Sequence, residues 1–142
     1  MSLKKLKERI KKNEGYSNKP YQDQLGFYTI GYGHLITEKE SKYYIKKFKK
    51  KHVEKLFEID FKKARDQYTK NFLKQNHTTS EKELLVEMVF QLGAKGVSKF
   101  KKMLYFLNKK QKFMASLEML DSLWYLQTPE RVKNLIKNYT KK

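Results

Sequence analysis

The chain lacks cysteine, and its 142 residues include only two prolines and three arginines. Without cysteine, disulfide bonds play no part in the fold. No stretch is apolar and long enough to cross a bilayer, and charges recur every few residues at the N-terminus, so we expect neither a transmembrane segment nor a signal peptide. We find no internal repeat and no proline- or serine-rich linker, which indicates a single domain over residues 1–142.

Histidine is also scarce. The three histidines, His34, His52 and His77, are far apart in the sequence and do not have the spacing of metal ligands. The sequence therefore predicts neither a metal ion nor a cofactor.

Acidic residues are few compared with basic ones. Fifteen Asp and Glu face 33 Lys and Arg, which gives a formal charge of +18. Such a balance is typical of nucleic-acid binding, but almost all of the basic residues are dispersed lysines, whereas base reading favours arginine. We expect no specific nucleic acid. Two explanations of the lysines stay open: an A/T-rich genome, or attraction to an anionic polymer other than nucleic acid, such as anionic wall polymers.

The densest basic patch is residues 46–51, KKFKKK. It is interpreted either as a solvated helix face or as a contact with the wall or a membrane surface. The basic segments 100–113 and 132–142 are also amphipathic, which keeps membrane disruption open as a separate activity.

The segment with the most chemical content is NEGYSNKPYQDQLGFYTIGYGHL, residues 13–35. Apolar residues recur at helical spacing before it, so a helix should end near residue 12 or 13, with Gly15 after it and Glu14 at its C-terminus. There the helix dipole favours a protonated acid. Runs 19–22 and 27–30 predict a hairpin whose turn holds Asp23, bringing Asp23 and Thr29 towards Glu14. Two carboxylates in one cleft are the usual apparatus for glycoside hydrolysis.

Three blocks in order carry a family resemblance. E-G at 14 and 15, Y-x-D at 21–23 and GxxTIGYGHL at 26–35 resemble the catalytic region of phage-type lysozymes, the muramidase family of the T-even bacteriophage endolysin. EMVFQLGAKG at 87–96 and WYLQTPER at 124–131 resemble the C-terminal lobe of that family. The segment between His34 and Asp60 is shorter than in the T-even enzyme, so we expect a smaller first lobe with a changed outer cleft wall.

The resemblance implies roles for individual residues. Glu14 matches the general acid, Asp23 the second carboxylate and Thr29 the hydroxyl that helps to hold the attacking water. This implies inversion, which spacing in the sequence does not test. The positions that match the sugar-binding cleft are Leu35, Phe90, Met103 and Glu118, the last two differing in residue type from the T-even enzyme.

Four further residues are assigned supporting roles. His34 is interpreted as a structural partner of Asp60, with a catalytic base as the alternative, and the pair should raise the pKa of His34. Arg131 is expected near Glu14 in a structural role, because a guanidinium would favour the ionised acid. Gln91 is expected to hydrogen-bond across the cleft to the hairpin.

The remaining chain predicts helices. Capping patterns occur at Thr37 with Glu40, at Ser80 with Glu83 and at Thr128-Pro129-Glu130. Helices are predicted over residues 38–72 with a break near 50–52, over 81–92 with Gly93 and Gly96 ending it, and over 98–108, 112–121 and 129–139.

These patterns predict an α+β, mainly α-helical, lysozyme-like fold of a monomer. A small hairpin lobe should cover about 13–60, and a long helix should connect it to a helical lobe made of 1–12 and 61–142. The expected function is hydrolysis of the β-1,4 bond between N-acetylmuramic acid and N-acetylglucosamine in bacterial peptidoglycan by an endolysin. It would accumulate in the host bacterial cytoplasm and reach the wall with help from a holin-like pore. The alternative is a non-catalytic basic protein that binds cell wall or nucleic acid on a lysozyme scaffold.

Overall fold

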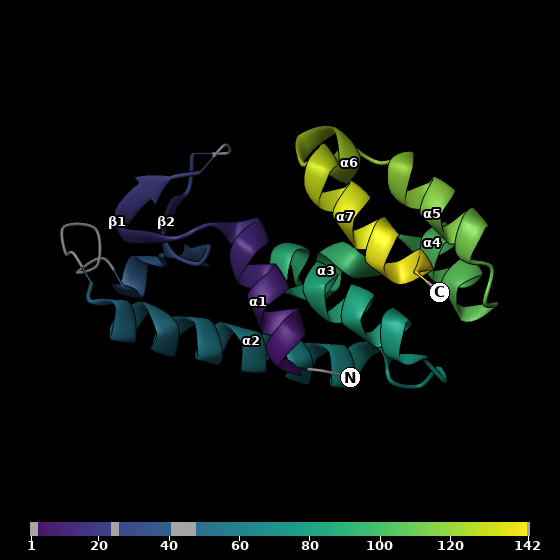
Figure 1. The fold of residues 1–142 in the computed structure, drawn as a ribbon, viewed down its shortest axis with the longest axis horizontal. Helices are drawn as coiled ribbons and strands as arrows, with labels where there is room; N and C mark the ends of the chain where they lie inside the picture. The colour runs from purple at the N-terminus through teal and green to yellow at the C-terminus, as the bar shows by residue number, and fades with distance from the viewer. Residues whose placement is uncertain (1–2, 24–25, 41–47, 142) are drawn as a thin grey trace. The chain divides into compact units, whose positions relative to one another are not determined.

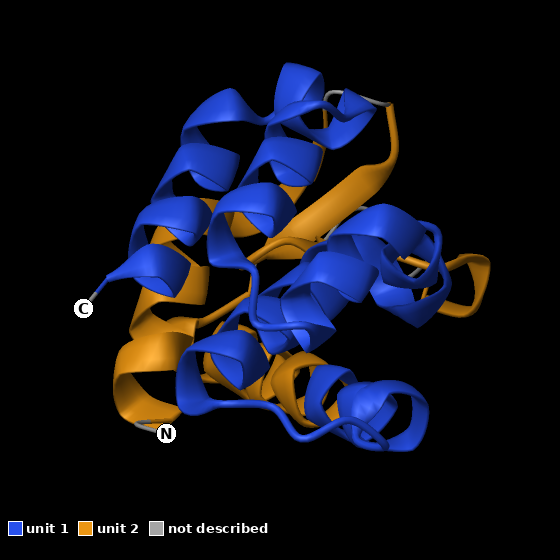
Figure 2. Ribbon diagram, turned by 90° about the vertical axis from the view of Figure 1, so that its right-hand side faces the viewer, with its two compact units in different colours: residues 1, 64–142 blue, residues 2–63 orange. Residues whose placement is uncertain are grey.

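The computed structural model describes residues 3–23, 26–40 and 48–141. Figure 1 shows a small sheet and a set of helices, and the predicted α+β, mainly helical class is confirmed. The chain divides into two compact units, residues 2–63 and residues 64–142, which are coloured separately in Figure 2. We call them the sheet unit and the helical unit. The predicted lobe boundaries at residues 12 and 60 stay a prediction.

The sheet unit begins with α1, Leu3–Glu14. Leu6 and Ile10 lie one helical turn apart and are fully buried, which gives this short helix one apolar face. Gly15 has a φ of 76° and donates its N–H to the Lys11 carbonyl at 3.0 Å. This is the left-handed residue that commonly closes a helix, so the predicted end of the helix is confirmed.

The predicted hairpin is part of a three-stranded antiparallel sheet in the order β1-β2-β3. Its strands are β1, Ser17–Gln22, β2, Tyr28–Gly31, and β3, His34–Leu35. The third strand was not predicted. It forms because Gly31 and Gly33, at φ 70° and 73°, reverse the chain within a few residues and return it beside β2.

The segment after β3 corrects the prediction of helix over residues 38–72. Residues 38–40 form one 3₁₀ turn, where the Glu40 carboxylate accepts the Thr37 N–H at 3.1 Å. Residues 41–47 lie outside the described part. Phe48 and Lys49 are not helical, and α2 runs over Lys50–Phe72, so the break precedes Lys50 instead of following it. The KKFKKK patch therefore lies partly outside the description, with Lys50 and Lys51 exposed at the start of α2.

Helix α2 contributes to both units. Val53, Phe57 and Phe61 are buried at four-residue spacing in the sheet unit, and Ala64 and Tyr68 are buried in the helical unit. The stacked rings of Phe57 and Phe61 lie 6.0 Å apart. This spacing places each set of side chains on one side of the helix.

Helix α3, Thr79–Ser98, contributes more buried residues than any other helix of the helical unit. It begins with a capping box formed by Thr78 and Glu81, so the predicted pair Ser80 and Glu83 is wrong by two residues. Gly93, at φ 76° and ψ 161°, interrupts the regular helix at the residue where its end is predicted, and a second helical stretch continues to Ser98. The predicted end at Gly96 is wrong, because Gly96 lies within this second stretch.

The helical unit is completed by α4, Lys101–Asn108, α5, Lys112–Leu120, α6, Leu123–Gln127, and α7, Pro129–Thr140. Helix α5 packs against α4 and α7, and their contacts bury Leu107, Met119 and Leu135. Helix α6 was not predicted. Pro129 begins α7 as predicted, but the Thr128 hydroxyl does not cap it, because that hydroxyl donates back to the Trp124 carbonyl at 3.2 Å.

Among the described residues, every helix is too short or too polar to span a bilayer.

Candidate active site

One face of the sheet brings together residues that the sequence marked as functional. Tyr21 pairs with Thr29, and Thr29 pairs with Leu35, so the three side chains lie side by side on that face. Thr29 is only 5% exposed, whereas Tyr21 is 37% and Leu35 is 52% exposed. A buried hydroxyl between two exposed apolar side chains is an arrangement suited to a ligand that has both polar and apolar surfaces.

The turn after β1 fixes the orientation of Asp23. Asp23 Oδ1 accepts the Phe27 N–H at 2.9 Å, and the Asp23 N–H donates to the Phe27 carbonyl at 2.8 Å. The Gly26 N–H donates to the Asp23 carbonyl at 3.0 Å. Short side-chain to backbone bonds of this kind are the reason that aspartate is favoured in turns. Asp23 is thus held by the same residue, Phe27, that contacts Thr29.

The Thr29 hydroxyl donates to the Phe27 carbonyl at 3.1 Å. A threonine hydroxyl has one proton to donate and two lone pairs that accept. With the proton directed to Phe27, the lone pairs of Thr29 Oγ1 are the groups with which it can meet a water or a sugar hydroxyl.

Glu14 is the last residue of α1, and its carboxyl group lies against Gly33. A Cβ atom built on Gly33 would collide with Glu14 Oε2 and come within 2.9 Å of the carboxyl carbon. Gly33 therefore serves two purposes: it adopts φ 73° and leaves the space that the Glu14 carboxyl group occupies. Spacing in the sequence did not identify Gly33 as the neighbour of Glu14.

Tyr21 links the two candidate carboxylates electrostatically. Partial burial raises the pKa of Tyr21, and the charges of Glu14 and Asp23 raise it further. The charges of both carboxylates thus act on one phenol. Glu14 lies against Gly33, and Thr29 pairs with Tyr21.

His34 is held between two carboxylates. Its Nδ1 lies 2.8 Å from Asp60 Oδ2, and its Nε2 lies 3.0 Å from Glu40 Oε2. Burial alone would lower the pKa of His34, but the hydrogen bonds and charges of Asp60 and Glu40 outweigh that effect and raise the pKa. Asp60 is thus the partner of His34, as predicted. Glu40 was missed as a partner, although its place in a capping pattern six residues after His34 was a signal.

A second network braces the end of α1. Lys11 Nζ lies 2.5 Å from Glu54 Oε2, and the Tyr32 hydroxyl donates to Glu54 Oε1 at 3.1 Å. The ammonium group also lies over the Tyr32 and Phe57 rings, at 5.3 and 4.9 Å from their centroids. The hydrogen bond from Lys11 is the main cause that lowers the pKa of Glu54. Because Lys11 precedes Glu14 by one helical turn, this network positions the candidate acid.

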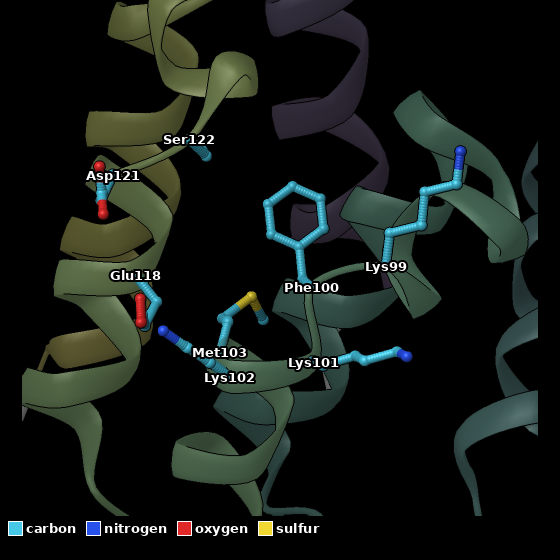
Figure 3. Close-up of a pocket in the computed structure, with 8 residues that line it drawn as sticks. All are labelled: Lys99, Phe100, Lys101, Lys102, Met103, Glu118, Asp121 and Ser122. Carbon is cyan, nitrogen blue, oxygen red and sulfur yellow. The ribbon is translucent and has the colours of Figure 1, made fainter.

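Met103 and Glu118, both predicted to bind substrate, line one cavity of about 480 Å³ in the helical unit. Figure 3 shows that Lys102 and Glu118 point towards one another across it, with Phe100 on another side. The complete lining is Lys99, Phe100, Lys101, Lys102, Met103, Glu118, Asp121 and Ser122. The substrate-binding role of these residues stays a prediction.

The other predicted residues of the helical unit lie on α3 and α7. Phe90 is half-buried on α3. Trp124 Nε1 donates to Gln91 Oε1 at 2.9 Å, and Gln91 Nε2 donates to Thr128 Oγ1 at 3.4 Å, so the described bonds of Gln91 connect helices within this unit. Arg131 Nε lies 3.5 Å from Glu87 Oε2, and both side chains are buried.

Within residues 3–23, 26–40 and 48–141, no group of three or more His, Asp or Glu side chains could hold a metal ion.

Comparison with known proteins adds independent evidence. Residues 11–139 match the family model described as phage lysozyme. Two proteins of Dictyostelium discoideum are similar over 92% of this chain and 91% of their own lengths: probable T4-type lysozyme 2, at 35% identity, and probable T4-type lysozyme 1, at 32% identity.

Proposed function

We propose how this chain, which belongs to the phage lysozyme family and is a lysozyme of the muramidase type, carries out hydrolysis. Glu14 is its general acid, and Asp23 and Thr29 activate the attacking water. The substrate that the family implies is peptidoglycan. The bond cleaved in this proposal is the β-1,4 bond from N-acetylmuramic acid to N-acetylglucosamine.

The position of Glu14 supports its role as the acid. It ends α1, where the partial negative charge of the helix dipole disfavours a carboxylate and favours the protonated form. Its carboxyl group packs against the bare backbone of Gly33, which leaves room for the group and restricts where it can lie. The acid gives its proton to the glycosidic oxygen as the bond to the anomeric carbon breaks.

The bonds of Asp23 and Thr29 support their joint action on water. Phe27 orients both groups, because its N–H donates to Asp23 and its carbonyl accepts from Thr29. A water that donates one hydrogen to Asp23 and one to Thr29 Oγ1 would keep a lone pair for the anomeric carbon. Asp23 then takes the proton that the water loses as it attacks. Attack by water on the face opposite the leaving group inverts the configuration.

The charge of +18 supports binding to an anionic polymer. Peptidoglycan carries peptide carboxylates, so the field of the protein should raise the rate of encounter, and added salt should reduce it.

The biological role in this proposal is that of an endolysin that lyses a host bacterium. It accumulates in the cytoplasm and reaches the wall through a pore made by a separate protein. The resemblance of the three motif blocks to the T-even endolysin supports this role. Production in bacteria with and without such a pore-forming protein tests it: lysis only with the pore is expected, and lysis without it would overturn the need for the pore.

The decisive experiment measures reducing ends released from purified peptidoglycan, with mass analysis of the fragments. Glu14→Gln should lower the rate on the order of 10³-fold or more, because proton transfer is lost. Asp23→Asn should also lower it strongly. Glu8→Gln is the matched control, since Glu8 is an exposed acid on the same helix, and it should retain full activity.

Two outcomes would overturn the assignment. Full activity of Glu14→Gln would exclude it as the acid, and absence of release by the wild type would favour a binding protein on this scaffold. The anomeric configuration of the first product, followed by NMR, should be inverted. Retention would instead make Asp23 a nucleophile.

A further inference from the structure

Helices α5 and α6 present an unusually apolar surface to solvent. All four exposed residues of α5 are apolar: Phe113 is 73%, Met114 is 39%, Leu117 is 43% and Leu120 is 39% exposed. Leu123 and Leu126 of α6 add 68% and 74% exposure. We call these six residues the apolar face.

Three residues of the apolar face lie on one side of α5 and so form a patch rather than a scatter of single residues. Phe113, Leu117 and Leu120 are spaced by four and three residues, which places them on one side of α5. Scattered apolar residues are ordinary on a protein surface, but a contiguous patch indicates an interaction site.

The polar residues of α5 are directed elsewhere. The Ser116 hydroxyl is buried and donates to the Lys112 carbonyl at 2.8 Å. Glu118 points towards Lys102 at the cavity between α4 and α5, and Asp121 also lines that cavity (Figure 3). These two acidic groups therefore belong to the cavity lining, whereas Glu130 of α7 is exposed and lies 3.4 Å from Lys133 Nζ.

The helices in contact with α5 carry exposed lysines. Helix α5 packs against both α4 and α7. Lys109, directly after α4, and Lys133 and Lys137 of α7 are exposed, whereas Lys101 and Lys102 line the cavity. An apolar helix packed against two basic helices has the charge and hydrophobicity pattern of a surface that rests on an anionic bilayer.

We propose that the apolar face of α5 and α6 docks on an anionic phospholipid bilayer, with its apolar side chains in the interface and Lys109, Lys133 and Lys137 at the headgroups. A second copy of this chain is a poorer occupant, because two proteins of charge +18 repel each other. The face shares only Phe113 with the amphipathic segments 100–113 and 132–142 that the sequence indicated, and those segments contain the lysines of the proposal. Its binding does not depend on Glu14.

Membrane docking would give this lysozyme a second surface of contact besides its polymer substrate. The side chains of the apolar face lie in the helical unit, whereas Glu14, Asp23 and Thr29 lie in the sheet unit. Loss of docking and loss of hydrolysis are therefore separable by mutation.

The test is co-sedimentation of the whole protein with vesicles of phosphatidylcholine alone or of phosphatidylcholine mixed with phosphatidylglycerol. Wild type should bind the anionic vesicles at least tenfold more tightly. The double variant Leu123→Gln/Leu126→Gln should bind them on the order of 30-fold more weakly, since two large apolar side chains no longer enter the interface.

The matched control is Ile59→Gln/Leu73→Gln, which removes two exposed aliphatic side chains outside the apolar face, 63% and 48% exposed. It should bind like wild type. All variants should hydrolyse soluble peptidoglycan fragments at the wild-type rate, which verifies that they are folded.

A second arm tests the lysines. Lys133→Gln/Lys137→Gln should weaken binding to anionic vesicles by about fivefold per lysine and leave binding to neutral vesicles unchanged. Equal binding of wild type to both vesicle types would overturn the proposal. So would an equal loss in the Leu123/Leu126 variant and its control. A wild-type dimer in sedimentation that becomes monomeric in the Leu123/Leu126 variant would assign the face to self-association.

Discussion

The two units of this lysozyme are stabilised in different ways. In the sheet unit, charged side chains such as Lys11, Glu54 and His34 form a network of half-buried hydrogen bonds around a small core. Four of the five glycines with positive φ lie there: Gly15, Gly26, Gly31 and Gly33. In the helical unit, most of the buried residues are aliphatic or aromatic and come from packed helices.

This difference indicates that the sheet unit contributes mainly to activity and the helical unit mainly to stability. Strained turns and partly buried charges position reacting groups, but they contribute little net stability. Packed helices contribute stability and impose few constraints on chemistry. Substitutions in the sheet unit should therefore lower activity more than stability, and substitutions in the helical unit should do the reverse.

The largest effect is expected from Leu107→Ala in the helical unit. Leu107 is fully buried, so the free energy of unfolding should fall by about 2 to 5 kcal/mol, measured by urea denaturation followed by circular dichroism. At a temperature where the variant stays folded, kcat on peptidoglycan should equal that of wild type. A lower kcat in the folded variant would contradict the division between the units.

Gly33→Ala should produce the converse result in the sheet unit. The new Cβ would displace the Glu14 carboxyl group, so kcat should fall on the order of 100-fold, because catalysis depends on exact positioning of the acid. Gly96→Ala is the matched control. Its Cβ would lie 3.1 Å from Leu92 Cβ within a helix, and it should leave kcat unchanged. Equal kcat in both variants would refute the placement of Glu14 against Gly33.

Lys110→Met tests a strongly buried carboxylate of the helical unit, Glu81, that pairs with an exposed lysine. Lys110 Nζ lies 2.6 Å from Glu81 Oε1, and Glu81 is 1% exposed. Loss of the lysine leaves a buried carboxylate, and the free energy of unfolding should fall by about 2 kcal/mol, less than for a fully buried pair because Lys110 is half exposed. Lys101→Met, an exposed lysine on α4, should change it little.

The same pair sets a dependence on pH. Burial alone would raise the pKa of Glu81, but hydrogen bonds from Lys110 and Thr78 outweigh it, so the pKa is lowered. A carboxyl group whose pKa is lowered by folding stabilises the folded state at pH values above its pKa in the unfolded chain. This stabilisation is lost as the pH falls through its pKa in the folded protein. The stability of wild type should therefore decline in acid below about pH 4.3. Lys110→Met should show a smaller decline there, and an unchanged decline would remove Glu81 as its source.

His34→Asn is expected to have the smallest effect on stability. The contribution of His34 is lost as the pH rises, whereas that of Glu81 is lost as the pH falls. The pKa of His34 is raised, so its bonds to Asp60 and Glu40 stabilise the sheet unit below about pH 6.5 and weaken as the pH rises through the folded value. The loss at pH 6 should be about 1 to 2 kcal/mol. Hydrogen exchange at the Ile36 amide, which bonds to the Tyr28 carbonyl at 2.9 Å, measures it.

The matched control for this variant is His52→Asn, whose ring lies edge-on to Phe48 at 6.0 Å. It should leave exchange at Ile36 unchanged. If His34→Asn keeps the wild-type pH dependence of exchange, another group is responsible.

Local features of the structure could be predicted from the sequence, because the determining residues are close along the chain. Gly15 ends α1, the Asp23 turn joins β1 to β2, and Pro129 begins α7, each for a reason contained within a few residues. The motif of Glu14, Asp23 and Thr29 was identified in the same way, and the family that it indicated is confirmed.

Features that depend on distant residues could not be predicted. The sequence contains two overlapping capping patterns at the start of α3, Thr78 with Glu81 and Ser80 with Glu83. The structure uses the first, in which Glu81 also pairs with Lys110, 29 residues away. Contact between Glu14 and Gly33, and the position of Glu40 beside His34, follow from how β3 and the 3₁₀ turn fold back. The spacing of residues in the sequence did not predict how β3 and the 3₁₀ turn fold back.

Trp124, the one tryptophan of the chain, gives this enzyme a built-in optical reporter. Its indole is 4% exposed, packs edge-on against Phe100 at 5.6 Å and donates to Gln91. Fluorescence excited selectively at tryptophan therefore reports on the environment of Trp124 in the helical unit, whereas circular dichroism reports on the secondary structure of the whole chain. If the two units melt separately, the two signals will give different midpoints; a shared midpoint will show that they melt as one.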